Sequence, residues 1–252
     1  MKNFARLHID KVHPLEIWNL PFRDSIVADY LSAEILSVRG AAYCEAVVAE
    51  LLTVYQSESW ARVQKVSFVF PESVELTPSG FHVWQKADRE FYQGVASALR
   101  HLGLGTIVDV GQSRAKVFDR ETGELSFYAR PLSLTSTHDL SEEAICQRDD
   151  RETYRTQQEV LNQWFAEFWP KTSATVLLAL PCEVDDRLNF GTTTYLGLKN
   201  PGFLKTLRGD LDASQEVAIL NDAELSAGYF AKSVGGALII TLGTGVGAAW
   251  IE

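Results

Sequence analysis

The sequence predicts an α/β fold with a largely parallel sheet. From residue 104 onward, apolar segments typical of strands alternate with segments whose apolar residues recur at helical spacing, and this alternation is typical of parallel sheets. A glycine-containing hairpin opens this part of the chain, and a second, glycine-rich hairpin closes it. Hydrophobic residues make up 46% of the chain and charged residues 22%, which is ordinary for a globular protein of this length.

The first hundred residues predict short strands and helices in irregular order. The spacing of apolar residues decides between helix and strand, while proline and glycine mark loops and helix ends. The expected elements are a strand at 3–9, a loop at 10–23, helices beginning at Ser25 and after Gly40, a buried strand at Val66–Phe70, irregular chain at 71–85, and a helix from Phe91 that Gly103 ends.

The remaining residues give the clearer pattern. They predict a three-stranded start, then helices and strands in turn, then the closing hairpin. The expected elements are strands at Thr106–Val110, Ala115–Phe118 and Leu125–Ala129, a helix at 151–169, a strand at Ala174–Leu180, a helix near Phe203–Leu207, a strand at Val217–Leu220, a short helix opened by Asn221-Asp222, and the hairpin strands Ala237–Leu242 and Ala248–Ile251.

The charge balance and the cysteines narrow the classes of protein. The formal net charge is −10 and the sequence has no basic cluster, so we expect neither a nucleic-acid partner nor a membrane. The three cysteines lie far apart and form neither a disulfide framework nor a metal motif. With no signal-like apolar run at the start, we expect a cytoplasmic protein. The oligomeric state is left open, a homodimer included.

The first candidate site follows the strand at Thr106–Val110. Asp109 ends this strand, and the turn Gly111-Gln112-Ser113 leads into the next one. Backbone N–H groups of such a turn can hold phosphate oxygens, Ser113 can add a hydroxyl, and a carboxylate can hold Mg²⁺ through water. The alternative is an ordinary hairpin with no ligand.

The second candidate site is the turn between the last two strands. Gly243, Thr244, Gly245, Val246 and Gly247 carry three glycines in five residues, which leaves the backbone open to the close approach of a ligand. The alternative is a tight turn with a bulge.

The third candidate site is Asn221-Asp222, which follows the strand Val217–Leu220. A carboxylate at this position can act as a general base that takes a proton from a substrate hydroxyl. The alternative is a side chain that only caps the following helix.

Together these motifs resemble the ROK family of sugar kinases, in the actin/hexokinase superfamily. The segment Ile107–Ser113 resembles the family's first phosphate motif, Leu178–Asp185 its strand ending in Pro-Gly-x-Val, and Val217–Glu224 the strand that delivers its catalytic aspartate. The segment Ile240–Gly247 matches the second phosphate motif most closely. The resemblance implies a two-lobed actin/hexokinase-like (ribonuclease H-like) α/β fold.

The order of the motifs is rotated relative to the family. Residues 1–103 resemble the part that follows the second phosphate motif in the family, so the resemblance implies a circularly permuted chain, which the exposed turns of a fold tolerate. The expected lobes are 1–103 as part of the C-terminal lobe, 104–235 as the lobe with the first phosphate motif and the catalytic residue, and 236–252 as the hairpin that completes 1–103.

The resemblance also implies the chemistry. Asp222 is the expected general base, Asn221, Asp222 and His8 contact a sugar or sugar-like substrate, and the two glycine turns bind ATP, with Mg²⁺ held by Asp109 through water. The sequence departs from the family at several positions: Gln112 for a glycine, Pro71-Glu72 for paired glycines, Ala5 for a glutamate, Thr194 for an asparagine, and no zinc motif. The alternative is therefore a degenerate ligand-binding or regulatory domain that has the fold but no turnover.

Overall fold

The computed structural model describes residues 3–15, 65–70, 82–85, 89–111, 113–135, 151–193, 195, 214–230, 237–242 and 246–252. The predicted helices that begin at Ser25, after Gly40 and near Phe203 lie outside these residues. In the described part of the chain the structure is mixed α/β, as the sequence predicts. No helix in that part is both long and apolar enough to cross a membrane.

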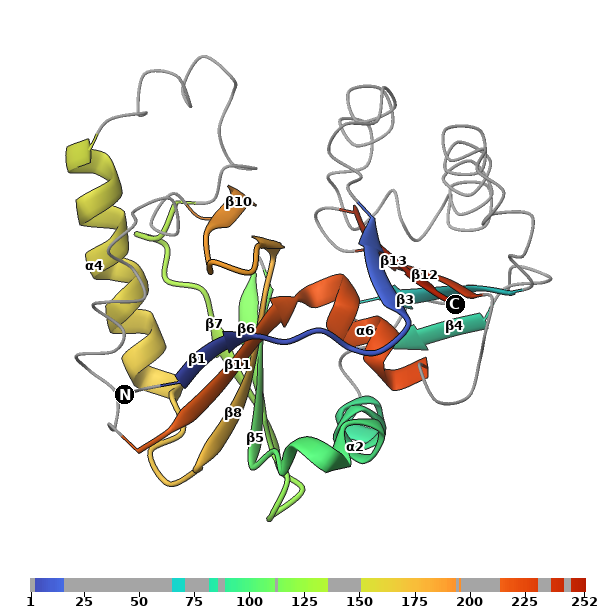
Figure 1. Cartoon of the computed structure of the whole chain (residues 1–252). Coiled ribbons are helices and arrows are strands. Elements are labelled where there is room, and N and C mark those ends of the chain that lie inside the picture. Colours follow the sequence, from blue (N-terminus) through green and yellow to red (C-terminus); the bar gives the residue numbers. More distant parts are fainter. Residues whose placement is uncertain are drawn as a thin grey trace. The chain divides into compact units, whose positions relative to one another are not determined.

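The chain forms two compact units, and each combines separated segments (Figure 1). The first unit contains residues 1–8 and 99–222, and the second contains residues 9–98 and 223–252. The first eight residues thus belong with the central segment and residues 223–230 with the second unit. The predicted lobe boundaries at 103 and 235 instead placed residues 1–8 in the C-terminal lobe and residues 223–230 in the lobe with the first phosphate motif.

The first unit is built on a six-stranded sheet. Its strand order is β1-β11-β8-β5-β6-β7, in which β1, β11, β8 and β5 are parallel and β6 and β7 are antiparallel to their neighbours. The strands are β1 (Asn3–Arg6), β5 (Thr106–Val110), β6 (Arg114–Asp119), β7 (Leu125–Ala129), β8 (Thr175–Leu180) and β11 (Glu216–Asn221). A short hairpin, β9 (Cys182–Val184) with β10 (Phe190–Thr193), follows β8.

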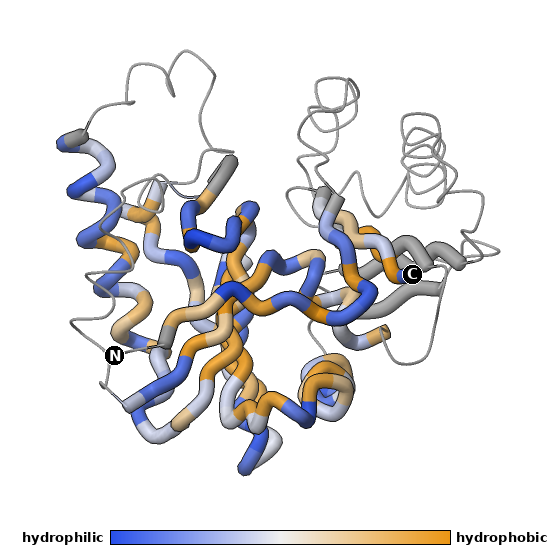
Figure 2. Tube along the Cα trace, in the orientation of Figure 1, coloured by the Kyte–Doolittle hydropathy of each residue, from blue (hydrophilic) through white to orange (hydrophobic). Residues whose placement is uncertain are grey.

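The central strands β5 and β8 are buried along almost their whole length because both faces of the sheet are covered. All five residues of β5 and the last five of β8 are buried, and Figure 2 shows both strands as mostly apolar. Helix α4 (Arg151–Phe168) contributes Leu161, Trp164, Phe165 and Phe168 to the same core cluster as Val108 and Leu178. These aromatic side chains follow the 3–4 residue spacing that marks one buried face of a helix.

The second unit contains a five-stranded sheet of order β2-β13-β12-β3-β4. β12 and β13 form the predicted antiparallel hairpin, β2 adds antiparallel to β13, and β3 and β4 add parallel on the far side of β12. The strands are β2 (Val12–Leu15), β3 (Lys65–Phe70), β4 (His82–Gln85), β12 (Ala237–Leu242) and β13 (Val246–Ile251). The sheet therefore joins the last strands of the chain to its first ones.

Two helices of the second unit pack closely. α2 (Arg89–Ala98) ends before a 3₁₀ turn, η5 (Arg100–Leu102), and Gly103 closes this turn with φ of 62°, as its predicted role as a helix terminator requires. α6 (Asp222–Phe230) places the Tyr229 ring against Phe91 of α2, with ring centroids 5.5 Å apart. Gly94 lies beneath the same ring, so the two helices approach where α2 lacks a side chain.

Four short strands differ from the sequence prediction or lie where none was expected. Residues 12–15 form β2 although Pro14 indicates a loop, because β2 lies at the sheet edge, where proline is tolerated. β4 lies at the end of the segment 71–85, which was expected to be irregular, and β9 and β10 were not anticipated.

Candidate functional site

The candidate residues of the first unit gather at one edge of its sheet. β5, β8, β11 and β1 are parallel, so their carboxyl ends share that edge. Asp109 pairs in register with Ala179 of β8, and Leu180 pairs with Asn221 of β11. Two strand spacings separate β5 from β11, which places Asp109 about 10 Å across the sheet from Leu220, two residues before Asp222. Ligands of α/β folds bind at this edge.

The turn after β5 is held by hydrogen bonds within the chain. The backbone N–H of Gly111 donates to the carbonyl of Arg114 over 3.0 Å, and the Tyr195 hydroxyl donates to the Gly111 carbonyl over 2.5 Å. The exposed Ser113 accepts at its carbonyl from the Arg130 N–H. Because the Gly111 N–H donates to Arg114 within the hairpin, a ligand at this turn would have to contact groups other than this N–H. Gln112 lies outside the described residues.

Asp109 is buried beside a lysine. Its side chain is 1% exposed, and its Oδ2 lies 3.6 Å from Nζ of Lys116, which is 3% exposed. The two residues face each other across the antiparallel pair β5–β6, so the strand register dictates the contact. The carboxylate charge is thereby balanced inside the protein.

These surroundings bear on the expected Mg²⁺. A metal held by Asp109 needs a carboxylate whose charge is available to the ion. Asp109 has an ammonium partner, and the described residues contain no group of three or more His, Cys, Asp or Glu that could hold a metal. The surroundings of Asp109 fit an ion pair better than a magnesium site.

Asn221 and Asp222 mark the change from β11 to α6. The Asn221 side-chain amide donates to the Cys182 carbonyl over 2.9 Å, which ties the end of β11 to the segment after β8. Asp222 is half-buried as the first residue of α6. Burial raises the pKa of the Cys182 thiol above its usual range, and the nearby Asp222 carboxylate raises it further. Cys182 is therefore a neutral thiol next to the proposed base.

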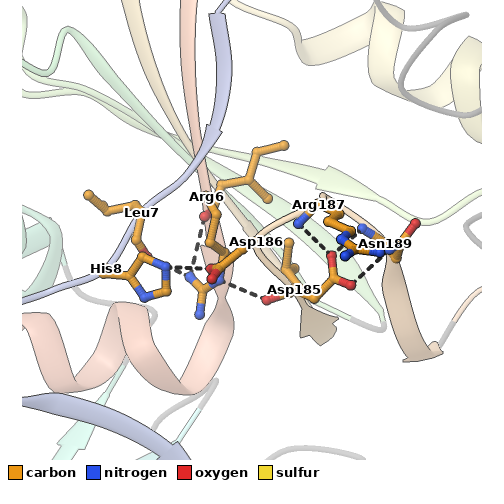
Figure 3. Close-up of polar contacts among 9 residues, drawn as sticks. Arg6, Leu7, His8, Asp185, Asp186, Arg187 and Asn189 are labelled. Carbon is orange, nitrogen blue, oxygen red and sulfur yellow. Dashed lines mark hydrogen bonds and ion pairs between the residues drawn. The ribbon is translucent and has the colours of Figure 1, made fainter.

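The end of β1 carries Arg6 and His8 to the same edge (Figure 3). The Arg6 guanidinium donates to the Val184 carbonyl over 2.8 Å and to the Leu7 carbonyl over 2.5 Å. His8 is exposed, and its Nε2 lies 2.7 Å from Oδ1 of Asp186. Since both partners of this pair are largely in solvent, a ligand can reach the imidazole.

The loop between β9 and β10 is ordered by Asp185. Its carboxylate accepts from the backbone N–H groups of Arg187 and Asn189 and from the Asn189 side chain, each over 2.8 Å (Figure 3). The Asn189 side chain, followed by these backbone donors, lowers the pKa of the Asp185 carboxyl below its usual value. This turn sets the position of the neighbouring Asp186.

The second glycine turn lies in the other unit. Gly243, Thr244 and Gly245 lie outside the described residues. Gly247 lies in β13 opposite Thr241, whose hydroxyl donates to the Gly247 carbonyl over 3.1 Å. Of the predicted phosphate residues in this unit, the structure therefore describes only one, and it belongs to a strand.

Several residues of the edge were not anticipated as site residues from the sequence: Arg6, Lys116, Cys182, Asp186 and Tyr195. Lys116 had a usable signal, because the hairpin Gly111–Ser113 aligns it with Asp109. Arg6 and Asp186 each contact a residue 178 positions away in the sequence. No local sequence pattern predicts such contacts.

Comparisons with protein-family models, with curated proteins and with solved structures found no match for this chain.

Proposed function

We propose that this protein is an ATP-dependent phosphotransferase that acts on a hydroxyl of a sugar or sugar-like molecule. We further propose that its fold is the two-lobed actin/hexokinase-like arrangement with a circularly permuted chain. The resemblance of its motifs to the ROK family motivates the proposal. Two structural observations support it.

The first observation is that the two sheets share one arrangement of strands. In the first unit β5, β6 and β7 form an antiparallel meander, and β8 and β11 add parallel on the other side of β5. In the second unit β12, β13 and β2 form the meander, and β3 and β4 add parallel on the other side of β12. The strands β12, β13, β2, β3 and β4 of the second sheet occupy the positions that β5, β6, β7, β8 and β11 have in the first. This sequence of strands is obtained only if the end of the chain, after β13, is joined to its beginning, before β2. A circularly permuted chain has this order.

The second observation carries the functional proposal. Asp109, Asn221, Asp222 and His8 come from three parallel strands, or directly follow them, and all lie at the carboxyl edge of the first sheet. The sequence predicts these four residues from three separate motifs, and unrelated motifs would not be expected to share one edge. A shared edge is what a single active site in an α/β fold requires.

In the proposed reaction Asp222 acts as the general base. Its carboxylate accepts the proton of a substrate hydroxyl as that oxygen bonds to the terminal phosphorus of ATP, and the bond from that phosphorus to the bridging oxygen breaks to release ADP. Mg²⁺ bound to the triphosphate supplies counter-charge. The chain's own contribution is mainly to position the reactants, which is the larger part of phosphoryl-transfer catalysis.

The remaining residues divide between the two reactants. His8, exposed and paired with Asp186, and Asn221, fixed by its contact with Cys182, are assigned to hydroxyl groups of the substrate. The turn Gly111–Ser113, with Gln112, and the turn Gly243-Thr244-Gly245 with Gly247 are assigned to the phosphates. Glycine at these places leaves room for phosphate oxygens close to the backbone.

A second function is favoured by one specific observation. The Gly111 N–H and the Asp109 carboxylate both have partners within the chain. A domain that binds a ligand without turnover has no need to free them, so a degenerate regulatory or ligand-binding domain is the alternative.

A screen for phosphoryl transfer tests the proposal. The protein is incubated with Mg-ATP and single sugars or polyols, and ³¹P NMR follows the reaction. The proposal predicts ADP and a new phosphate ester in equal amounts with at least one acceptor. Binding of Mg-ATP by calorimetry, with no ester formed from any acceptor, would favour the domain without turnover.

A further inference from the structure

The outer edge of β7 faces no other strand in the part of the chain that the structure describes. We infer that a second copy of this chain pairs with this edge, one β7 antiparallel to the other, so that the two six-stranded sheets join across a twofold axis. The inference does not depend on the proposed function, because β7 lies at one end of the sheet and β11, which leads into Asp222, lies near the other.

The backbone of β7 presents alternate residues to its free edge. The N–H of Asp119 donates to the Glu124 carbonyl, and the N–H of Arg130 donates to the Ser113 carbonyl, each over 2.9 Å. Because hydrogen-bonded and non-hydrogen-bonded pairs alternate in an antiparallel ladder, every second residue from Glu124 to Arg130 faces β6. The residues between them direct their N–H and C=O groups outward, and they are Leu125, Phe127 and Ala129.

A second β7 matches these outward groups in one register. With Phe127 of one copy opposite Phe127 of the other, Leu125 of each copy lies opposite Ala129 of the other. All three outward residues then form hydrogen-bonded pairs, since each pairs with a residue that is also directed outward. The strand is therefore complementary to its own antiparallel copy.

The sequence of β7 leaves this edge unprotected. Exposed sheet edges are usually blocked by proline, by charged side chains or by a bulge. Pro14 lies in the edge strand β2 of the second sheet, and Arg6 lies in β1 at the opposite edge of the first. By contrast β7 reads Leu-Ser-Phe-Tyr-Ala, and it pairs with β6 in a continuous register. An edge of this kind is open to pairing with another strand.

The exposed apolar side chains gather at the same place. Phe127 is 46% exposed and Leu132, three residues after β7, is fully exposed. They are the exposed large hydrophobic residues of the described part of the chain. In the proposed register the two Phe127 side chains lie directly opposite each other, and an aromatic cross-strand pair stabilises a sheet.

The charges at the two ends of β7 favour a second copy as the partner. Glu124 precedes the strand and is exposed, while Arg130 follows it and Arg114 lies beside its last residue. Antiparallel pairing centred on Phe127 sets Glu124 of each copy opposite Arg130 of the other. Opposite charges at such positions are stabilising, whereas a parallel arrangement would bring like charges together.

Sedimentation equilibrium on the full chain tests the inference. The wild type should have twice the 28.1 kDa mass of one chain. Phe127→Lys places two lysines opposite each other at the twofold axis and should give the mass of one chain. Leu132→Lys makes the same change beyond the end of β7 and should remain dimeric.

Three results would overturn the inference. They are a monomeric wild type, a Phe127→Lys protein that stays dimeric, and a loss of the dimer in Leu132→Lys as complete as in Phe127→Lys, which would indicate an apolar contact without strand pairing. Circular dichroism confirms that each variant is folded.

A cross-link tests the register. The Cα atoms of a hydrogen-bonded antiparallel pair lie about 5.5 Å apart, within the range that a disulfide spans. Phe127→Cys should therefore form a disulfide-linked dimer on oxidation, while Leu132→Cys and the wild type, with its three cysteines, should stay uncrosslinked. A cross-link through Leu132→Cys but not through Phe127→Cys would contradict the register.

A charge reversal tests the selection of the partner. Glu124→Lys turns two attractive contacts of the dimer into repulsive ones, so the dimer Kd should rise about 10-fold. Glu121→Lys, at an exposed position of the preceding turn, is the matched control and should change the Kd by less than about 2-fold. A Glu124→Lys protein that dimerises like the wild type, or an equal effect of both variants, would refute the pairing of Glu124 with Arg130.

Discussion

The second sheet repeats the arrangement of five of the six strands of the first, but the chain builds the two sheets in different ways. Five of the six strands of the first sheet follow one another between Thr106 and Asn221, whereas the second sheet takes two strands from the end of the chain and three from its first 85 residues. The comparison teaches that a sheet arrangement does not depend on where the chain crosses from one strand to the next. Local sequence patterns should therefore describe the first unit better than the second, because most strands of the first sheet lie in one stretch of the chain.

The largest expected change in stability concerns the first unit. Lys116→Met leaves the Asp109 carboxylate buried without its described ammonium partner, and breaking a buried pair in this way costs about 3–5 kcal/mol of the free energy of unfolding. Adding Asp109→Asn should recover most of that loss. Urea unfolding of the single and double variants measures both values.

The same variants sharpen the comparison of the units. Hydrogen exchange followed by mass spectrometry should show faster exchange in β5 and β6 of Lys116→Met, while β12 and β13 keep their protection. Equal loss of protection in both sheets would mean that the two units unfold as one. A Lys116→Met protein as stable as the wild type would show that the buried pair is not an important contact.

A smaller change is expected in the second unit. Gly94→Ala adds a methyl group that overlaps the Tyr229 ring, and overpacking of this kind costs about 1–3 kcal/mol. Gln93→Ala on the exposed side of the same helix is the control and should change the free energy of unfolding by less than about 0.5 kcal/mol. Helix propensity alone predicts that Gly94→Ala stabilises the protein. That result would contradict the close contact between Gly94 of α2 and Tyr229 of α6.

The sequence predicted the first sheet better than the second for a physical reason. β5 and β7 begin and end at the predicted residues, and β6, β8, β11 and α4 differ from prediction by one residue at one or both ends. Their strands are apolar and bounded by Gly111, Gly123 or proline, so local signals suffice. By contrast β2 contains Pro14, and β4 has only four residues, so their pairing in the second sheet depends on contacts far away in the sequence.

The candidate site also divides into residues that local sequence patterns reveal and residues that only distant contacts bring together. The motifs located Asp109, Asn221 and Asp222, because each follows a strand that the apolar pattern reveals. Asp186, which lies beside His8, could not be found in this way, since the two residues are 178 positions apart. Arg6 looked like an ordinary strand residue, and only the parallel pairing of β1 with β11 brings it to the carbonyl of Val184.

The smallest expected effect concerns the Asp185 turn at the edge of the first unit. The pKa of Asp185 is lowered chiefly by the Asn189 side chain, so its contribution to stability is present above the unfolded pKa of about 3.9 and is lost as the pH falls through the lower folded value. Asn189→Ala should raise the pKa of Asp185 toward 3.9. A ¹³C NMR titration of the carboxyl group measures this, and an unchanged pKa would show that the amide does not hold the turn.

The central claim is that Asp222 at the edge of the first sheet removes a proton during phosphoryl transfer. The most direct test is Asp222→Asn, with kcat measured by ADP release and the Kd for Mg-ATP measured by calorimetry. Asparagine keeps the size of the side chain and can still cap α6, but it cannot accept the proton. The account predicts that kcat falls by about 10²–10⁴-fold while the Kd stays within a few-fold of the wild-type value. Glu167→Gln, an exposed carboxylate on α4, should leave both unchanged. Full turnover in Asp222→Asn would contradict the account.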